Sequence, residues 1–178
     1  MSITQTYHAQ QFPNGYDLVD GVRMHQENGD QFQIPPDVLK RHLGSGQFVE
    51  LRINSQRFSV HEDTEEPCQC DSCQDVASQP ILGHPEPESL YPAPEGHVPA
   101  RGWGEDFWVQ IVDREGDHFL ATVDNHLHES RLHELSFGET IAFHARHVLT
   151  IHPSHRQELV LGMNEKDLRE LVNWLGKQ

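Results

Sequence analysis

The sequence predicts an α+β domain dominated by antiparallel strands, arranged as a bent sheet or partly open barrel with a C-terminal helix packed on it. Residues 107–112 and 118–123 alternate apolar and polar side chains, and this period of two is typical of half-buried strands. Turn residues at 113–117 lie between them and predict a hairpin. The end of the chain has helical spacing instead, so one sheet and one longer helix are expected.

The N-terminal region is expected to contribute little before a first hairpin. Residues 1–15 are mostly polar and predict a loose segment, which leaves a single domain over 16–178. Asp20-Gly21 lies between two short apolar stretches and suits a type I′ turn. The pattern therefore predicts a hairpin over 16–24.

A short helix and two strands are predicted next. The stretch 35–37, Pro-Pro-Asp, can open a helix up to Leu43, since Pro is tolerated in a first turn and Asp favours the positive helix end. Apolar residues then recur at alternate positions in 48–53 and again in 58–60. We expect two strands here, with Asn54 and Ser55 in the turn between them.

The C-terminal third is expected to hold three more strands and the terminal helix. The strand candidates are 139–145, 147–151 and 158–161. Asn164 is suited to cap a helix whose third residue is Asp167. Apolar residues follow at helical spacing and predict a stripe that packs in the core: Leu168, Leu171, Val172 and Leu175.

Composition and charge narrow the class of partner. The chain has 178 residues, 35% of them apolar, and a formal net charge of −15. Nucleic-acid binding needs a basic footprint, so this charge argues against it and favours a protein partner with a basic surface. No run of about 20 apolar residues is present, and the first residues lack the basic and apolar regions of a secretory signal. No membrane association and a cytoplasmic location are expected, while the oligomeric state stays open.

The strongest chemical signal is the run Cys68-Gln-Cys70-Asp-Ser-Cys73, which contains every cysteine of the chain. It lies in a Pro- and acid-rich insert over 61–104 that holds seven of the eleven prolines. Zn²⁺ takes four tetrahedral ligands, and the C-x-x-C spacing of Cys70 and Cys73 lets two thiolates hold one metal. With Cys68 as third ligand and His61 or His84 as fourth, the sequence predicts one structural Zn²⁺ per chain.

Other readings of the cysteines stay open. They can be free thiols on the surface of a long loop, or Cys70 and Cys73 can form a redox dithiol. The dithiol is less favoured, because no βαβ unit surrounds it and the nearby acids raise thiol pKa values. His97 is a more remote candidate for the fourth ligand.

Other polar and aromatic groups give weaker signals. His126, His128 and His133 can lie on a loop, where a second metal site is less favoured than solvated imidazoles. Phe107 and Trp108 should face opposite sides of a strand. Trp108, or Trp103 before it, can then cover the edge of the core or line a binding groove. No catalytic centre is predicted, since the chain has no G-x-S-x-G, P-loop, dinucleotide fingerprint or H-E-x-x-H motif.

The second half of the chain also shows a family-like order of short motifs. These are Phe107-Trp-Val, Gly116-Asp, Asp124-Asn, Leu135-x-x-Gly-Glu-x-Ile-x-Phe143 and His147-Val. The order resembles the YegJ-like domains, a bacterial family of uncharacterised small β-rich domains. Glu139 replaces the usual Asp, and the cysteine insert lies outside the family pattern. The resemblance implies a β-rich fold and carries no activity or site residue.

The sequence thus favours a non-enzymatic cytoplasmic binding module with a structural zinc site. One form of it is an immunity-type inhibitor, in which an acidic surface masks the basic cleft of a toxin. Alternatives are a metal-dependent enzyme, which requires an open coordination position at the zinc, and a metal carrier or sensor.

Overall fold

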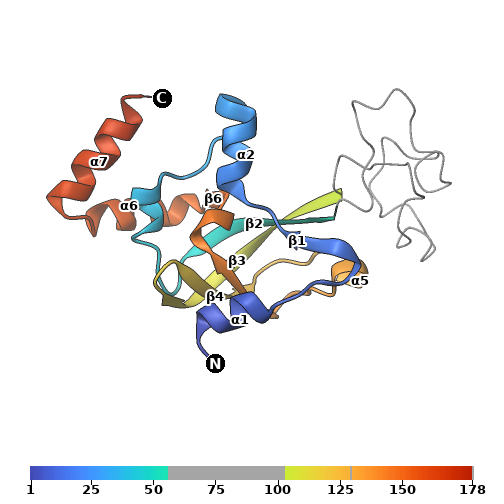
Figure 1. Cartoon of the computed structure of the whole chain (residues 1–178). Coiled ribbons are helices and arrows are strands. Elements are labelled where there is room, and N and C mark those ends of the chain that lie inside the picture. The colour runs from blue at the N-terminus through green and yellow to red at the C-terminus, as the bar shows by residue number, and fades with distance from the viewer. Residues whose placement is uncertain (56–102, 129, 178) are drawn as a thin grey trace, which may run out of the picture.

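The fold is an antiparallel sheet curled into a half-barrel with helices around it, which confirms the predicted α+β class (Figure 1). The computed structural model describes residues 1–55, 103–128 and 130–177. Within these ranges the strands are β1 (Tyr16–Leu18), β2 (Phe48–Ser55), β3 (Trp103–Glu115), β4 (His118–Val123), β5 (Thr140–His144) and β6 (Thr150–Ile151). They pair in the order β1-β2-β3-β4-β5, and β6 pairs with β2. β3 pairs with the whole length of β2 along one edge. The other edge of β2 is shared by β1 and β6.

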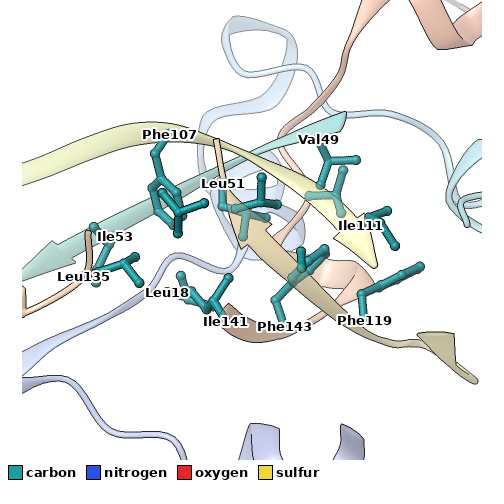
Figure 2. Packing of buried hydrophobic residues seen from close by; sticks show 14 of the residues in the cluster. Leu18, Val49, Leu51, Ile53, Phe107, Ile111, Phe119, Leu135, Ile141 and Phe143 are labelled. Carbon is teal, nitrogen blue, oxygen red and sulfur yellow. The ribbon is translucent and has the colours of Figure 1, made fainter. Parts of the chain in front are cut away.

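Alternation along the strands builds the core on one face of the sheet. Every second residue of β2 and of β4 is buried. Figure 2 shows these side chains meeting those of β1, β3 and β5 in one cluster. The labelled members are Leu18, Val49, Leu51, Ile53, Phe107, Ile111, Phe119, Leu135, Ile141 and Phe143. Because successive side chains point to opposite faces of a strand, the residues between them lie on the outer face.

The predicted β3–β4 hairpin is confirmed, with a tighter turn than expected. Gly116 lies at the turn with φ +62°, a conformation that favours glycine. The register shifts between Ile111 and Asp113, as at a β-bulge. Arg114 secures the end of the hairpin, because its guanidinium donates to the carbonyls of Arg41 and Leu43 at 2.5 and 2.9 Å.

The prediction of a turn at Asn54 and Ser55 is wrong, because both residues lie inside β2. Ser55 is the register partner of Trp103, so the chain leaves β2 and returns to β3 at the same end of one antiparallel pair. Residues 103–104, predicted to end the insert, belong to β3. The second predicted strand, 58–60, lies outside the described residues.

The N-terminal segment is ordered where a loose one was expected. Helix α1 spans Ile3–Ala9 and begins with a capping box between Ser2 and Gln5. None of its residues is fully buried, so the apolar pattern gave no sign of it. Contacts with β4 and β5 hold the helix on the sheet. The turn η1 (Pro13–Gly15) then leads into β1.

The predicted hairpin over 16–24 is also wrong. β1 is its first half, but Gly21–Asn28 forms helix α2. Asp20 caps this helix by accepting a hydrogen bond from the backbone N–H of Arg23. A Cβ on Gly21 would lie 2.7 Å from the Leu149 side chain, so this glycine permits close packing instead of a turn.

The remaining helices agree only in part with the elements predicted from the sequence. α3 spans Asp37–Lys40, shorter than predicted, and α6 spans Pro153–Leu161, where 158–161 had predicted a strand. Asn164 caps α7 (Glu165–Leu175) as expected, by accepting from the Asp167 N–H. Short turns and helices complete the described chain: η2 (Gly29–Gln31), α5 (Ser130–His133) and η6 (Ala145–His147).

The apolar stripe of α7 is only partly core. Leu171 is buried in a small cluster with Val38 of α3 and Met163, and Leu168 packs against that cluster. Val172 and Leu175 are 66% and 57% exposed, contrary to the prediction. The reason is that α7 lies beyond α6 and α3, away from the strands, so only one side of its stripe is covered (Figure 1). No helix of the described residues is long and apolar enough to cross a membrane.

Candidate binding site

The predicted zinc ligands cannot be placed in this structure. Cys68, Cys70, Cys73, His61 and His84 all lie outside the described residues. Among the residues that are described, no three His, Cys, Asp or Glu side chains are grouped so that they could hold a metal ion. The zinc site therefore stays a prediction.

The histidines of 126–133 differ from the predicted solvated loop at one position. His133 is 1% exposed. Its Nδ1 accepts the Leu135 N–H at 3.1 Å, and its Nε2 lies 3.4 Å from the carboxylate of Glu105. This imidazole fixes the chain before β5. His126 and His128 are exposed, as expected.

A pocket on the outer face of the sheet brings together aromatic rings from distant parts of the chain. It has a volume of about 400 Å³. Its lining comes from β2, β3, the turn after β4 and the start of α6: Phe48, Trp108, Asp124, Asn125, His152, Ser154 and His155. We refer to it as the Trp108 pocket. Phe107 points into the core with no exposure, so the predicted division between Phe107 and Trp108 is confirmed.

Four rings form the walls of the Trp108 pocket. The Phe48 ring stacks on the His155 imidazole, with centroids 5.6 Å apart and planes 20° apart. The Trp108 ring meets the His152 imidazole edge to face at 5.3 Å. The partial exposure of Phe48 and Trp108 leaves apolar surface open to a ligand.

Two hydrogen bonds hold the backbone of Asp124 next to Trp108. The N–H of Asp124 donates to the Trp108 carbonyl at 2.8 Å, and the N–H of Trp108 donates to Asn125 Oδ1 at 2.6 Å. The turn after β4 is thereby locked to β3. Asp124 itself is exposed and lines the pocket.

Two further acids lie beside the pocket. Glu50 is the register partner of Trp108, so the two side chains share the outer face. Glu158 accepts from Gln47 Nε2 at 2.9 Å and contacts His155 Nδ1 at the same distance. These hydrogen bonds hold the pKa of the Glu158 carboxyl below its usual range and keep it ionised. None of the described residues lining the pocket is Lys or Arg.

The start of α6 offers no free donors to the pocket. Pro153 is the first residue of the helix and has no N–H. The Ser154 N–H donates to Nδ1 of His152, and the His155 N–H donates to the His152 carbonyl. The pocket therefore presents carboxylates and ring faces, which suit a cation, and not the open N–H groups that bind an anion.

A larger groove lies between α2, α3 and α7. It has a volume of about 880 Å³, and Trp174 and the segment 33–36 lie along it. Its charged residues are mixed: Asp37, Glu165 and Glu170 face the same space as Lys166, Arg169 and Lys177. This groove has no charge preference that would identify a ligand.

Hydrogen bonds between Tyr7 of α1 and the pair Arg146 and His147 help to hold α1 on the sheet. Arg146 Nη2 donates to the Tyr7 hydroxyl at 2.8 Å, and that hydroxyl lies 2.9 Å from His147 Nε2. His147 Nδ1 is 2.9 Å from the carbonyl of Val19. A neutral imidazole with its proton on Nδ1 satisfies the whole chain of bonds, since Nε2 then accepts from Tyr7. Burial lowers the pKa of His147, in agreement with the neutral form.

The sequence identified only part of the Trp108 pocket. Trp108 was expected either to cover the edge of the core or to line a groove, and the structure places it in the lining of this pocket. The side chain of Trp103 is not described. Phe48, His152 and His155 were not predicted, and no local motif could have revealed them, because they come from β2 and from α6 some 100 residues later. Comparison of the chain with protein-family models, with curated proteins and with solved structures finds no match.

Proposed function

We propose that the protein is a non-enzymatic cytoplasmic interaction module that binds a protein partner, and that the contacting surface of the partner is basic. The observation that carries the proposal is the Trp108 pocket, in which partly exposed aromatic rings lie beside Asp124, Glu50 and Glu158, with no Lys or Arg among the described lining residues. Aromatic residues that are partly exposed in a concave site act as anchors in many protein interfaces. The net charge of −15 would steer a basic partner toward this surface.

The proposal includes one structural Zn²⁺ in the insert. Three thiolates from Cys68, Cys70 and Cys73 and one imidazole, from His61 or His84, would complete a closed tetrahedral site. The described chain leaves β2 at Ser55 and enters β3 at its register partner Trp103. An immunity-type inhibitor of a basic toxin is one form that this module could take.

Selection from a random peptide library tests the proposal without knowledge of the natural partner. We expect selected peptides to be rich in Lys and Arg, and their association with the intact protein to slow as ionic strength rises. The control peptides have the selected sequences with every Lys and Arg replaced by Glu, and they should not bind. Selected ligands that are neutral or acidic, or association rates that ignore salt, would contradict the proposal.

A further inference from the structure

The Trp108 pocket has the features of a site for one particular side chain. Resting on the proposed function, we infer that this pocket binds an arginine side chain of the basic partner. A guanidinium group is flat, permanently charged and able to stack on aromatic rings. The partly exposed rings of Phe48 and Trp108 offer such surfaces, and Trp is the strongest cation–π partner among the aromatic residues.

Asp124 supplies the counter-charge. It is held beside Trp108 by the two hydrogen bonds that join β3 to the turn after β4. An exposed carboxylate on a backbone held in this way can accept two parallel N–H bonds from one guanidinium, a geometry that an ammonium group cannot match. A guanidinium that stacks on Trp108 would find this carboxylate in the lining of the same pocket.

The other charges near the pocket act in the same direction. Glu50 lies next to Trp108 on the outer face, and Glu158 is kept ionised by Gln47 and His155. Arg52, which shares the outer face of β2 with Glu50, already pairs with Asp106 at 3.1 Å. An anionic ligand is disfavoured, because the first N–H groups of α6 are taken by His152.

The size of the site agrees with one side chain. A volume of about 400 Å³ is small for a folded element and large enough for the end of a long side chain with its water. The site would therefore anchor one residue of the partner, while the remaining contact area would lie on the acidic surface around it.

Small probes test the inference directly by NMR on the full-length protein. The probes are N-acetyl-arginine amide, N-acetyl-lysine amide and N-acetyl-citrulline amide, the last being nearly the same shape as arginine without its charge. We expect the arginine probe to shift the backbone signals of Trp108, Asp124 and His152 with weak affinity. The lysine probe should bind several-fold more weakly, and the citrulline probe should cause no shift.

Two variants and a charge-matched control separate the contributions. Asp124→Asn should weaken binding of the arginine probe about tenfold, the loss of one good charge-assisted hydrogen-bond pair. Trp108→Leu should abolish the binding. Asp30→Asn removes the same charge from an exposed acid of η2, outside the pocket, and should leave the affinity unchanged. Dispersed spectra of each variant show that the fold is kept.

The outcomes distinguish the inference from the proposed function. Equal binding of the three probes, shifts that map outside the pocket, or binding unchanged by Asp124→Asn would overturn the arginine site. Another outcome is that library-selected basic peptides bind with salt-dependent rates while Asp124→Asn and Trp108→Leu leave their affinity unchanged. That result would support the interaction module and contradict the arginine site in the pocket. If the arginine probe binds as expected and no basic peptide does, the pocket assignment would stand and the interaction module would fall.

Discussion

The side-chain amide of Gln10 forms both hydrogen bonds of the Ala142 backbone at the outer edge of β5. Gln10 Nε2 donates to the Ala142 carbonyl at 3.0 Å, and Gln10 Oε1 accepts from the Ala142 N–H at 2.9 Å. One side chain thus reproduces the pairing that a neighbouring strand would give. The contact covers part of an edge that would otherwise present open donors and acceptors.

Replacing Gln10 should weaken this edge. Gln10→Ala removes both hydrogen bonds and should lower the free energy of unfolding by about 1–2 kcal/mol. The Ala142 amide should exchange faster with solvent, which hydrogen-exchange NMR measures. Gln11→Ala, at the exposed neighbour, is the control. Unchanged exchange at Ala142 in Gln10→Ala would show that the edge does not depend on this contact.

Acid should destabilise the protein through His147. Its pKa is lowered in the folded state, chiefly by burial, and the neighbouring His144 has a lowered pKa for the same main reason. The unfolded chain takes up the proton near pH 6.5. Stability is therefore present in full above that pH and is lost as pH falls toward the folded pKa, by at most about 1.4 kcal/mol per pH unit for each proton.

Denaturant unfolding between pH 7.5 and 5 measures this effect. His147→Gln should be less stable at pH 7.5, because the bonds to Tyr7 and Val19 are broken or altered, and its stability should fall less steeply with acid. His126→Gln, at an exposed imidazole, is the control for loss of a histidine as such. Equal slopes in wild type and His147→Gln would contradict this role.

Lys40 should be a net cost to stability. Its side chain is 3% exposed, and its ammonium has no hydrogen-bond partner among the described residues. The nearest described carboxylate, on Asp37, is 3.7 Å away and 85% exposed. Lys40→Met keeps the apolar stem and should raise the unfolding free energy at pH 7 by about 1–3 kcal/mol. Lys166→Met, on an exposed lysine, should have little effect.

The gain from Lys40→Met should depend on pH in a defined direction. Burial lowers the pKa of Lys40 in the folded state. Below the folded-state pKa of Lys40, the buried charge lowers the free energy of unfolding by its full amount. This destabilisation disappears as pH rises toward the pKa of the unfolded chain, near 10.5. The stability difference between variant and wild type should narrow from pH 7 to pH 10. A constant difference would mean that packing, and not charge, explains the gain.

The insert should carry zinc. Protein purified without chelator should hold about one equivalent of Zn²⁺ by native mass spectrometry, since three thiols lie within six residues. Replacing Cys70 and Cys73 by Ser should abolish it. Ser72→Ala, inside the same run, should retain the metal. A metal-free protein with three freely reactive thiols would rule out the site.

Removing the metal should act locally. Among the described residues, those of the sheet and of the helices and loops around it already form one buried core cluster. Chelation should therefore speed amide exchange within 61–102 and leave β2 to β5 protected. Cooperative loss of protection in the strands on adding chelator alone would show that the metal also supports the core.

The sequence by itself determined the elements whose signals are local. β3 and β4 follow from alternation together with a glycine at the turn, and α7 begins where Asn164 can cap it. These features depend on neighbours a few residues apart, so one sequence contains all the information they need. The fold class follows from them, because a half-buried antiparallel sheet must curl or be covered to bury its apolar face.

Only the tertiary structure decided what depends on distant partners. Asp20-Gly21 suits a turn or a helix start, and packing of Gly21 against Leu149 selects the helix. α1 has no buried stripe and is ordered by polar contacts such as Gln10 with Ala142. The amphipathic pattern of α7 could not tell which half of its stripe would be covered, and the Trp108 pocket exists only because β2, β3 and α6 meet. Local sequence patterns predict which side chains favour burial. Which of them are buried depends on the elements that pack against them in the folded chain.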